Sequence, residues 1–433
     1  MTDIRKVVKK LIPQKLFKQI EPTGHLIEAV VANIRYGFPS RHMHVIGVTG
    51  TNGKTTTTYL IEKMLSDAGF KVGMLNTVSV GIGDDIKLQT EHLTTAQSSI
   101  LQRRLRDFKR AGVEWVVLET SSHSLAQNRI WGIPYEIAVI TNVTHEHLDY
   151  HSNFNNYLEA KRRLFSLASK HGLKFGVVNA DGPNADKFIK SIPRSVSYGI
   201  QSGQLRADSI KLAVDHSTFR ASIDKETYDI RINIPGEFNV SNSLAAVAVG
   251  RELGLTKKQI EQGIAALKGV EGRMTSIEAG QKFKVIVDFA NTPDGYEKLF
   301  ASLRPSVKGK LVAVFGSPGR RDEAKRPMQG EIAGRYCDEV VLTEDDCRDT
   351  DPNEIDQQIA DGAKKAGKII NKDLFIIVDR ESAIKFALQR VDSADDMVVL
   401  LGKGHERTIT RADGEHPWCE IEVARKVLRD LKI

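Results

Sequence analysis

Cysteine is scarce in this 433-residue sequence, because only Cys337, Cys347 and Cys419 are present and they lie far apart. The spacing fits neither a disulfide framework nor the paired cysteines of a zinc site. A few free thiols are typical of proteins that work in a reducing cytoplasm. We therefore expect a cytoplasmic protein without a cysteine-bound metal.

Long apolar runs are also absent. No run approaches the roughly 20 residues that a membrane span needs, and the N-terminus MTDIRKVVKKLIPQ lacks the apolar core of a signal peptide. Residues 1–40 form a short leader with six basic residues in the first twenty. This leader is either an amphipathic helix that touches a membrane surface or a helix packed on the next domain with its lysines in water, and we favour the second. Integral membrane association is not expected.

Aromatic residues make up only 6% of the chain, although the net charge is +7. Beyond the first twenty residues, basic side chains do not alternate with aromatic ones as they do in many nucleic-acid-binding proteins. Acidic ligands, such as phosphates and carboxylates, explain the charge more simply. With 41% hydrophobic and 27% charged residues, the chain has the composition of an ordinary globular protein, and its length suggests two or three domains.

Strand-like and helical patterns alternate along most of the chain, which predicts an α/β fold. Residues 41–270 predict a central P-loop-type domain with a mostly parallel sheet, to which the alternating pattern of Leu205–Pro235 adds an antiparallel patch. Residues 271–433 begin a second series, which predicts a C-terminal doubly wound, Rossmann-like domain. The expected strands are Lys71–Val78, Trp115–Thr120, Ile137–Val143 and Phe175–Ala180 in the first series, and Lys284–Ala290, Lys310–Gly316, Glu339–Thr343, Leu374–Asp379 and Met397–Gly402 in the second.

The most informative segment is GVTGTNGKTTTT, residues 47–58. It follows a short apolar strand and precedes a helical run, Tyr59–Ala68, which is the arrangement that holds a nucleotide triphosphate. Backbone N–H groups of the turn and of the helix N-terminus face the phosphates. Lys54 is expected to reach the β- and γ-phosphates, and the Thr55 hydroxyl to bind Mg²⁺. Val48 stands where the common P-loop pattern has its first glycine.

Polar residues follow the next strands of the first series. Glu119 ends the strand WVVLET and is placed to hold Mg²⁺. The adjacent Ser-Ser-His has no nucleophile elbow around it, so a serine hydrolase is not favoured. The segment THEHLDYH, residues 144–151, resembles a zinc cluster but lacks a known three-ligand spacing. A second Mg²⁺ site, substrate contacts or a plain polar loop all remain open for it. From its helical pattern alone, Lys161 is a solvated surface lysine.

Three charged loops follow strands of the second series. They are GSPGRRD at 316–322, DDCR at 345–348 and GKGHE at 402–406. Because the carboxyl ends of parallel strands meet at one edge of a sheet, these loops are expected to line one site. Arginine there is suited to binding carboxylates or phosphates through two hydrogen bonds.

Taken together, the motifs resemble the Mur ligase family, the ATP-dependent amide-forming enzymes of peptidoglycan precursor synthesis. The resemblance runs from about residue 41 to the C-terminus. It favours the branch that adds a diamino acid to UDP-N-acetylmuramoyl-L-alanyl-D-glutamate. The motifs that carry it are GTNGKTTT, LTTAQ, ETSSHSLAQNR, TNVTHEHLDYH, YLEAKRRLF, VVNAD, GEFNVSN, EGRM, DFANTPD, RRDEAKRP and GKGHE.

The resemblance implies a role for each matching residue. It implies two Mg²⁺ ions served by Thr55, Glu119 and His147, and a Lys161 that CO₂ carbamylates, so that Lys54, Lys161, Glu119 and His147 form the catalytic set. The residues implied to hold ATP are Gly50, Thr51, Asn52, Gly53, Lys54, Thr55, Thr56, Asn239, Asn242, Arg273 and Asp288. Those implied to contact the muramoyl-peptide are Thr94, Thr95, Ser121, Gln127 and Arg129. Those implied to contact the incoming amino acid are Arg321, Asp345, Arg348, Gly402 and Glu406. A monomer is expected.

The sequence departs from the family pattern in several places. Residues 1–40 stand where full-length members carry a longer uridine-binding domain, so either UDP is held differently or the substrate lacks it. The acceptor signature Asp-Asn-Pro-Arg appears as Asp-Asp-Cys-Arg at 345–348, which leaves both meso-diaminopimelate and L-lysine open as acceptors. Asn291 replaces a histidine near the nucleotide, and the TTP motif ends in Ala96.

Three alternatives accompany this interpretation. One is a ligase of the same family that acts on a substrate without UDP. Another is a glutamate ligase similar to folylpolyglutamate synthase, although GKGHE would then have no role. The third is a nucleotide-binding scaffold that has lost turnover, which the retained Lys54, Thr55, Glu119, His147 and Lys161 disfavour.

Overall fold

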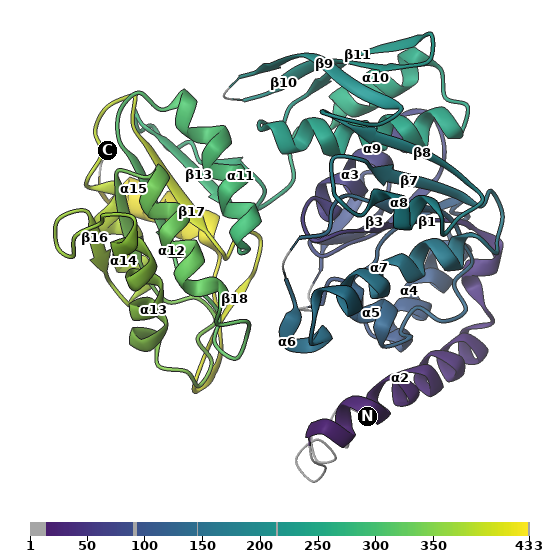
Figure 1. Ribbon diagram of the computed structural model, residues 1–433, viewed down its shortest axis with the longest axis horizontal. Coiled ribbons are helices and arrows are strands. Elements are labelled where there is room, and N and C mark those ends of the chain that lie inside the picture. Colours follow the sequence, from purple (N-terminus) through teal and green to yellow (C-terminus); the bar gives the residue numbers. More distant parts are fainter. Residues whose placement is uncertain (1–13, 90–92, 145, 214, 432–433) are drawn as a thin grey trace.

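The computed structural model describes residues 14–89, 93–144, 146–213 and 215–431. Two sheets, each covered by helices on both faces, lie side by side (Figure 1). Each sheet is formed by one of the two series of strands expected from the sequence. The α/β fold is therefore confirmed.

The first sheet has eleven strands in the order β11-β10-β9-β8-β7-β6-β1-β5-β2-β3-β4. The pairs from β2 through β5, β1, β6, β7 and β8 to β9 are parallel, and the strands at both edges are antiparallel. The parallel strands are buried apolar runs, as expected of a sheet covered on both faces. The bounds are β1 His44–Thr49, β2 Val72–Leu75, β3 Ser79–Ile82, β4 Asp85–Leu88, β5 Trp115–Glu119, β6 Tyr135–Ile140, β7 Phe175–Asn179, β8 Arg194–Gly199, β9 Leu205–Leu212, β10 Ser217–Ile223 and β11 Glu226–Ile232.

Helices cover the two faces of this sheet with separate apolar clusters. On one face, α3 (Lys54–Asp67), α9 (Glu237–Glu252) and α10 (Lys257–Ala266) pack over one side of the strands. On the other, α4 (Ser98–Arg110) and α7 (Phe154–Ala168) do the same. The short helices α5 (Ser122–Ala126), α6 (Leu148–His151) and α8 (Ala185–Ile189) follow strands of the sheet. Burial alternates along β10 and β11, which confirms the antiparallel patch expected in Leu205–Pro235.

The second sheet has six strands in the order β12-β13-β17-β14-β15-β16, all parallel except β12. Helices α11, α12 and α13 cover one face, and α14 and α15 cover the other. A separate ribbon, β18–β19, follows β17. The bounds are β12 Thr275–Ser276, β13 Lys284–Asp288, α11 Pro293–Leu303, β14 Leu311–Phe315, α12 Lys325–Tyr336, β15 Glu339–Leu342, α13 Pro352–Lys365, β16 Leu374–Ile376, α14 Arg380–Leu388, β17 Met397–Leu401, β18 Thr408–Arg411, β19 Gly414–Pro417 and α15 Glu420–Leu431.

Several elements differ from the expected bounds. Helix α3, which follows the phosphate-binding turn, begins at Lys54 rather than at the expected Tyr59, because Gly53 ends that turn. The expected strand Ile137–Val143 is β6, which ends at Ile140. The polar residues after that strand leave the sheet and enter the loops of the site.

The leader contributes helix α2 (Gln14–Tyr36), which packs against α4 through the buried Ala29, Ala32 and Asn33. Packing on the next domain is the interpretation favoured above. The outer face of α2 also carries exposed isoleucine and valine side chains, and the side chains of Lys15 and Lys18 lie outside the described residues. Residues 1–13 of the leader lie outside the described residues. No described helix combines the length and apolarity needed to cross a bilayer.

Candidate active site

The loops after the strands of both sheets line one cavity with a volume of about 1160 Å³. Ligands in such sheets bind at the carboxyl ends of the strands, and here both sheets present those ends to the same space. On one side the lining includes residues 51–56, and on the other it includes Arg321, Asp345, Arg348 and Glu406. The cavity therefore brings the phosphate-binding segment and the three charged loops together.

The turn between β1 and α3 has the geometry of a phosphate-binding loop. Gly53 has a φ of +83°, and a Cβ on it would lie 2.3 Å from Asn242 Oδ1. A Cβ on Gly50 would lie 1.8 Å from Thr141 Oγ1. Only glycine fits at either position. The backbone N–H of Asn52 donates to Asn142 Oδ1 at 2.9 Å, which fixes the turn from the neighbouring strand.

Lys54 opens helix α3 and lines the cavity together with Thr55 and Thr56. Its ammonium group donates to the Thr51 carbonyl oxygen at 2.9 Å. Burial lowers the pKa of Lys54, and the Glu119 carboxylate partly opposes that shift. The amine is therefore positioned at the turn, next to the N-terminus of the helix.

Glu119, at the end of β5, is 1% exposed and forms a small hydrogen-bonded network. The Thr55 hydroxyl donates to its Oε2 at 2.9 Å, and the Thr77 hydroxyl donates to its Oε1 at 2.9 Å. Arg273, from the loop before β12, reaches Thr55 Oγ1 at 3.3 Å. A hydroxyl and a carboxylate oxygen thus lie together at the start of α3, and both are ligand types that Mg²⁺ prefers.

Lys161 is 1% exposed, so the sequence-based interpretation of a solvated surface lysine is wrong. It lies on the inner face of α7, where its Nζ donates to the Gly50 carbonyl oxygen at 2.6 Å and lies 4.4 Å from the centre of the Tyr157 ring. Burial, reinforced by the nearby charge of Lys54, lowers the pKa of Lys161 well below its ordinary value. The shift favours the neutral amine over the ammonium form relative to an exposed lysine.

His147 also lines the cavity and has a left-handed backbone, with a φ of 57°. Burial lowers its pKa well below the ordinary value, and His123 contributes to the shift. The His147 ring is therefore neutral at physiological pH and offers a nitrogen lone pair. Its Nδ1 lies 3.8 Å from Glu146 Oε1.

The other two described histidines of this region, His123 and His151, pack against each other. The ring centres of His123 and His151 are 5.4 Å apart, and His151 Nε2 hydrogen-bonds with Ser122 Oγ at 3.1 Å. Burial lowers the pKa of His123 to about 3 and that of His151 to about 4. His145 and the side chain of Asp149 lie outside the described residues.

The residues matched to nucleotide contacts come from both sheets. Asn239 and Asn242 of α9 line the cavity, and Asn242 donates to Asn239 Oδ1 at 3.0 Å. Asp288, at the end of β13, accepts from the backbone N–H groups of Met274 and Ala290 at 2.8 and 2.7 Å. The Arg273 guanidinium lies 4.5 Å from the centre of the Phe289 ring, on the same wall.

The residues matched to muramoyl-peptide contacts divide into two groups. Thr94 lines the cavity, whereas Thr95, Ser121, Gln127 and Arg129 lie outside its lining. Arg129 is 3% exposed and donates to the backbone carbonyl oxygens of Thr95 and Ala96, while Thr95 Oγ1 donates to the Glu119 carbonyl oxygen at 3.0 Å. In this structure Arg129 and Ser121 hydrogen-bond to the loop that carries Thr94.

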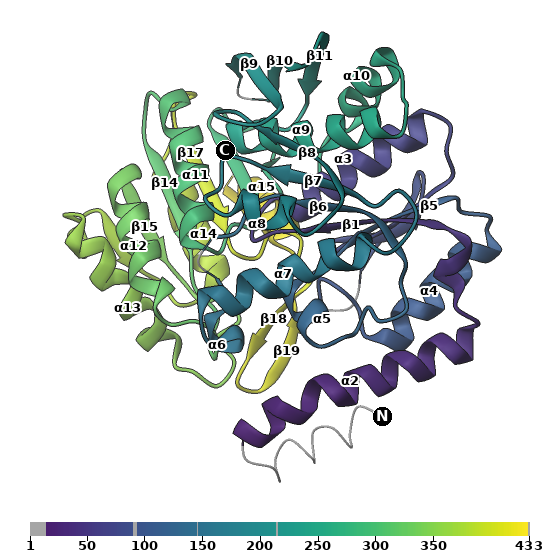
Figure 2. The ribbon, with the colours of Figure 1, turned by 45° about the vertical axis from the view of Figure 1, so that its right-hand side comes forward.

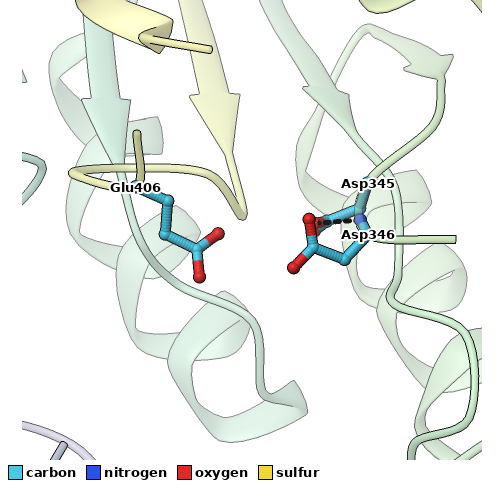
Figure 3. Close-up of side chains that lie close together, drawn as sticks. All are labelled: Asp345, Asp346 and Glu406. Carbon is cyan, nitrogen blue, oxygen red and sulfur yellow. Dashed lines mark hydrogen bonds between the residues drawn. The ribbon is translucent and has the colours of Figure 1, made fainter. Parts of the chain in front are cut away.

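The residues matched to the acceptor amino acid surround the opposite end of the cavity. Figure 3 shows Asp345 and Asp346, from the loop after β15, facing Glu406 from the loop after β17, and one ligand atom of each lies within 4.8 Å of the others. Gly402 has a φ of +99°, and a Cβ there would lie 2.7 Å from Asp345 Oδ2. Arg348 Nη1 donates to the Gly319 carbonyl oxygen at 2.6 Å, which joins two of the three charged loops.

Lys403 neutralises part of this acidic cluster. Its fully buried ammonium lies 2.8 Å from Asp346 Oδ1, 2.6 Å from Glu406 Oε2 and 3.7 Å from Asp345 Oδ1. Burial alone would lower the pKa of Lys403, but the three carboxylates raise it above its ordinary value. Burial raises the pKa of Glu406 to about 7. With Arg321 and Arg348 on the same wall, this end of the cavity offers both acidic and basic groups to a zwitterion.

Sequence reasoning did not assign roles to several residues that complete the site. Lys403 is hidden inside GKGHE, where only burial distinguishes it from a surface lysine. Asp294 Oδ2 and Thr292 Oγ1 accept hydrogen bonds from Asn52 Nδ2 at 2.9 and 3.2 Å, which joins the phosphate-binding turn to α11. Lys325 Nζ donates to the Asn291 carbonyl oxygen at 2.9 Å and lies 3.9 Å from Glu146 Oε1. No local pattern in the sequence reveals such contacts between distant segments.

These features fit a nucleotide triphosphate with Mg²⁺. The glycine turn leaves space where a Cβ would intrude, the helix N-terminus presents N–H groups, and Thr55 and Glu119 supply oxygen ligands. The cavity exceeds the roughly 300–1,000 Å³ of most single-ligand pockets. It therefore has room for more than one substrate.

Comparison with known proteins agrees with this arrangement. Residues 48–250 match the Mur ligase middle domain, and residues 272–404 match the Mur ligase, glutamate ligase domain. A UDP-N-acetylmuramyl-tripeptide synthetase of Roseiflexus sp. (strain RS-1) is 40% identical over 95% of this chain and 83% of its own length. A UDP-N-acetylmuramoyl-L-alanyl-D-glutamate–2,6-diaminopimelate ligase of Caldanaerobacter subterraneus subsp. tengcongensis is 36% identical over 93% of this chain and 81% of its own length.

Solved structures show the same relationship. A UDP-N-acetylmuramoyl-L-alanyl-D-glutamate–2,6-diaminopimelate ligase matches with a TM-score of 0.62 and 31% identity over 90% of this chain and 79% of its own. Folylpolyglutamate synthase of Mycobacterium tuberculosis, solved with ADP, matches with a TM-score of 0.72 over 96% of this chain and 97% of its own, but at 16% identity it shares only the fold. The domain matches and the relatives near 40% identity show that this chain belongs to the Mur ligase family.

Proposed function

We propose that this chain is an ATP-dependent ligase that adds a diamino acid to UDP-N-acetylmuramoyl-L-alanyl-D-glutamate in peptidoglycan precursor synthesis. The main support for this proposal is that one cavity joins two features. It has a phosphate-binding turn with Thr55 and Glu119 on one side and a mixed-charge cluster around Lys403 on the other. The names of the relatives agree with this activity. In this proposal residues 41–270 activate the first substrate and residues 271–433 hold the second.

The first step activates a carboxylate. One of its oxygens attacks the γ-phosphorus of ATP, the bond from that phosphorus to the bridging oxygen breaks, and ADP leaves with the electron pair. Lys54 and the N–H groups of the turn stabilise the charge that spreads over the transferred group. The product is an acyl phosphate.

Thr55, Glu119 and His147 would hold Mg²⁺, which supplies charge neutralisation on the phosphates. Two ions are proposed because these groups extend along the cavity from α3 to the loop before α6. His147 suits a ligand role because its depressed pKa keeps the ring neutral.

Lys161 is proposed to be carbamylated. Its neutral amine attacks the carbon of CO₂, a C–N bond forms while one C=O π bond breaks and leaves its electron pair on oxygen, and the nitrogen loses a proton to water. A buried cation thereby becomes an anion. Burial beside Lys54 supports this assignment because an anion next to Lys54 is more favourable there than a second ammonium group. The carbamate would then orient the Mg²⁺ side of the cavity.

The second step forms the amide. The acceptor amine, after losing its proton, attacks the acyl carbon, and the carbon–oxygen bond to phosphate breaks. Asp345, Asp346 and Glu406 suit the ammonium groups of the acceptor, and Arg348 and Arg321 suit its carboxylates. Exclusion of water from the closed cavity protects the acyl phosphate. Meso-diaminopimelate and L-lysine both fit this description, and we propose that the enzyme works as a monomer in the cytoplasm.

A screen of phosphate release and of amide product by mass spectrometry tests the proposal. UDP-linked and UDP-free muramoyl-dipeptide are each supplied with ATP, Mg²⁺ and either meso-diaminopimelate or L-lysine. We expect an amide with the UDP-linked substrate and one of the two diamino acids. Lys54→Ala should release no phosphate, whereas Lys63→Ala, on an outer turn of the same helix, should behave like the unchanged protein.

The same screen separates the alternatives. Amide formation only with the UDP-free dipeptide would indicate a ligase for a substrate without UDP. Glutamate addition to a folate, with no reaction on muramoyl-dipeptides, would indicate the folylpolyglutamate branch. Nucleotide binding with no amide from any pair would indicate a scaffold, and each of these results would overturn the proposal.

A further inference from the structure

The outer face of helix α2 carries a row of exposed apolar side chains. Ile20, Ile27, Val31 and Ile34 are 41%, 61%, 53% and 65% exposed. Their spacing of seven, four and three residues places them on one side of the helix. Within the described part of the chain, this row faces outward, and Figure 2 shows α2 along the lower edge of the molecule.

The opposite face of α2 packs on the rest of the protein and holds the helix in place. The exposed apolar row therefore lies on a helix with a fixed position. Asn33 is buried, and its Nδ2 donates to the carbonyl oxygens of Ala29 and Trp131 at 2.9 and 2.8 Å. The Trp131 side chain is itself 38% exposed and lies beside this end of α2. Tryptophan combines an apolar ring with a polar N–H, which suits the boundary between water and a lipid bilayer.

A row of basic side chains lies on α4, the helix against which α2 packs. Arg103, Arg106 and Arg110 recur at intervals of three and four residues and therefore share one face of α4. That face meets α2, because the Arg106 guanidinium lies 5.0 Å from the centre of the Tyr36 ring.

We propose that this face, formed by the apolar row of α2, Trp131 and the basic row of α4, binds peripherally to an anionic lipid surface. The isoleucines enter the head-group region, and the arginines contact lipid phosphates, which is how interfacial amphipathic helices bind. Pairing with a second copy of the chain is less favourable because it would bring two basic rows together. The proposal is independent of the ligase activity.

Sedimentation with vesicles tests it. The full chain is mixed with vesicles of phosphatidylcholine alone, or of phosphatidylcholine mixed with phosphatidylglycerol, at low and high salt. We expect binding to the anionic vesicles only, weakened by salt. The double variant Ile27→Asn with Ile34→Asn should lose at least about tenfold in affinity, because both side chains leave the lipid.

Matched variants distinguish binding through this surface from non-specific binding to vesicles. Ile369→Asn changes an isoleucine in the C-terminal domain that is also more than half exposed, at 53%, and should leave binding unchanged. Arg103→Gln with Arg110→Gln should weaken binding to anionic vesicles, and circular dichroism checks that each variant is folded. Absence of binding to anionic vesicles, equal losses in Ile369→Asn, or a dimer in analytical ultracentrifugation that Ile27→Asn with Ile34→Asn abolishes would each overturn the proposal.

Discussion

At the scale of single residues, burial decides what a lysine or a glutamate does in this protein. Lys161, Lys403 and Glu62 are each nearly inaccessible, yet their surroundings differ. Lys403 is surrounded by carboxylates and stays charged, whereas Lys161 lies near Lys54 and is pushed toward its neutral form. The same residue type is therefore held as a cation in one domain and shifted toward its neutral form in the other.

Lys161→Ala should lower kcat by about a hundredfold or more, because an oriented charged group at the transferring phosphate is worth that much. Lys170→Ala, an exposed lysine shortly after the same helix, should keep full activity. Short carboxylic acids should partly restore the Lys161→Ala variant, and intact-protein mass spectrometry in bicarbonate should detect the added CO₂. Indifference of activity to the substitution would contradict the carbamate assignment.

Arg348→Ala should raise the KM for the diamino acid at least about tenfold while changing the KM for ATP little. The reason is that the proposed pair between half-buried Arg348 and a carboxylate of the diamino acid would be lost, and truncating one member of such a pair costs a few kcal/mol. Arg320→Ala removes an exposed arginine of a neighbouring loop, paired with Asp349 at the surface, and serves as the control. Steady-state kinetics with each substrate varied in turn measures both constants. Equal increases for ATP and the acceptor would argue against an acceptor role.

Glu62 links stability to pH. It is 1% exposed on α3, accepts a hydrogen bond from Ser66 Oγ at 2.8 Å, and burial raises its pKa from 4.5 to about 7. Because its folded pKa exceeds its unfolded pKa, the folded state binds more protons between these values, and stability falls as the pH rises through that window.

The free energy of unfolding should fall between pH 4.5 and 7 because of Glu62, and this contribution is at most about 3 kcal/mol. Glu62→Gln should remove this part of the decline. Urea unfolding at a series of pH values measures it. Glu159→Gln, at an exposed position on α7, should leave the pH profile unchanged. An unaltered slope in Glu62→Gln would show that this carboxyl group does not cause the dependence.

At the scale of elements, local sequence signals set where helices begin. The Thr256 hydroxyl accepts from the Gln259 backbone N–H, and the Gln259 side chain accepts from the Thr256 backbone N–H, which forms a capping box at α10. Helix α10 packs on α3, which carries the phosphate-binding turn at its start. A local cap thus supports an element on which the site depends.

Thr256→Ala should lower the free energy of unfolding by about 1 kcal/mol, the usual cost of losing such a cap. Chemical denaturation followed by circular dichroism measures the change. Ser99→Ala, at an exposed position in α4, lacks a capping role and should cause no comparable loss. A stable Thr256→Ala variant would mean that packing alone fixes the start of α10.

At the scale of the whole molecule, the two sheets are joined across the cavity by a few polar contacts. Asn52 on the phosphate-binding turn bonds Asp294 on α11, and Lys325 of α12 lies near Glu146. These contacts connect the domain proposed to activate the first substrate with the domain proposed to hold the second. They are therefore placed to keep water from the acyl phosphate.

Asp294→Ala should uncouple the reaction, so that ADP forms a few-fold faster than the amide, because a less closed cavity admits water. The ratio of ADP to amide product measures the coupling. Glu297→Ala, on the same helix but paired with Arg335, should keep the ratio at one. A ratio of one in Asp294→Ala would show that closure does not depend on this contact.

The sequence alone predicted the α/β fold, the two series of strands and the phosphate-binding turn. These features are local: a turn that holds phosphates uses consecutive backbone N–H groups, and a buried strand is a consecutive apolar run. The resemblance of the motifs added the family and the proposed acceptor role of the three charged loops, which the strand pattern had already placed at one site. The sequence pattern misjudged Lys161, because one polar residue on an otherwise amphipathic helix does not reveal whether it faces water or the protein interior.

Only the tertiary structure decided how charges from distant segments combine. Lys403 becomes a shared counter-ion because three carboxylates from two loops surround it, and Asn52 meets Asp294 across 242 positions of the chain. The apolar outer face of α2 likewise became visible only when its inner face was packed on α4. Neighbouring residues in the sequence determine local features such as turns and strands. Burial and charge pairing depend on the folded chain, and burial and pairing set the charge of each group in the site.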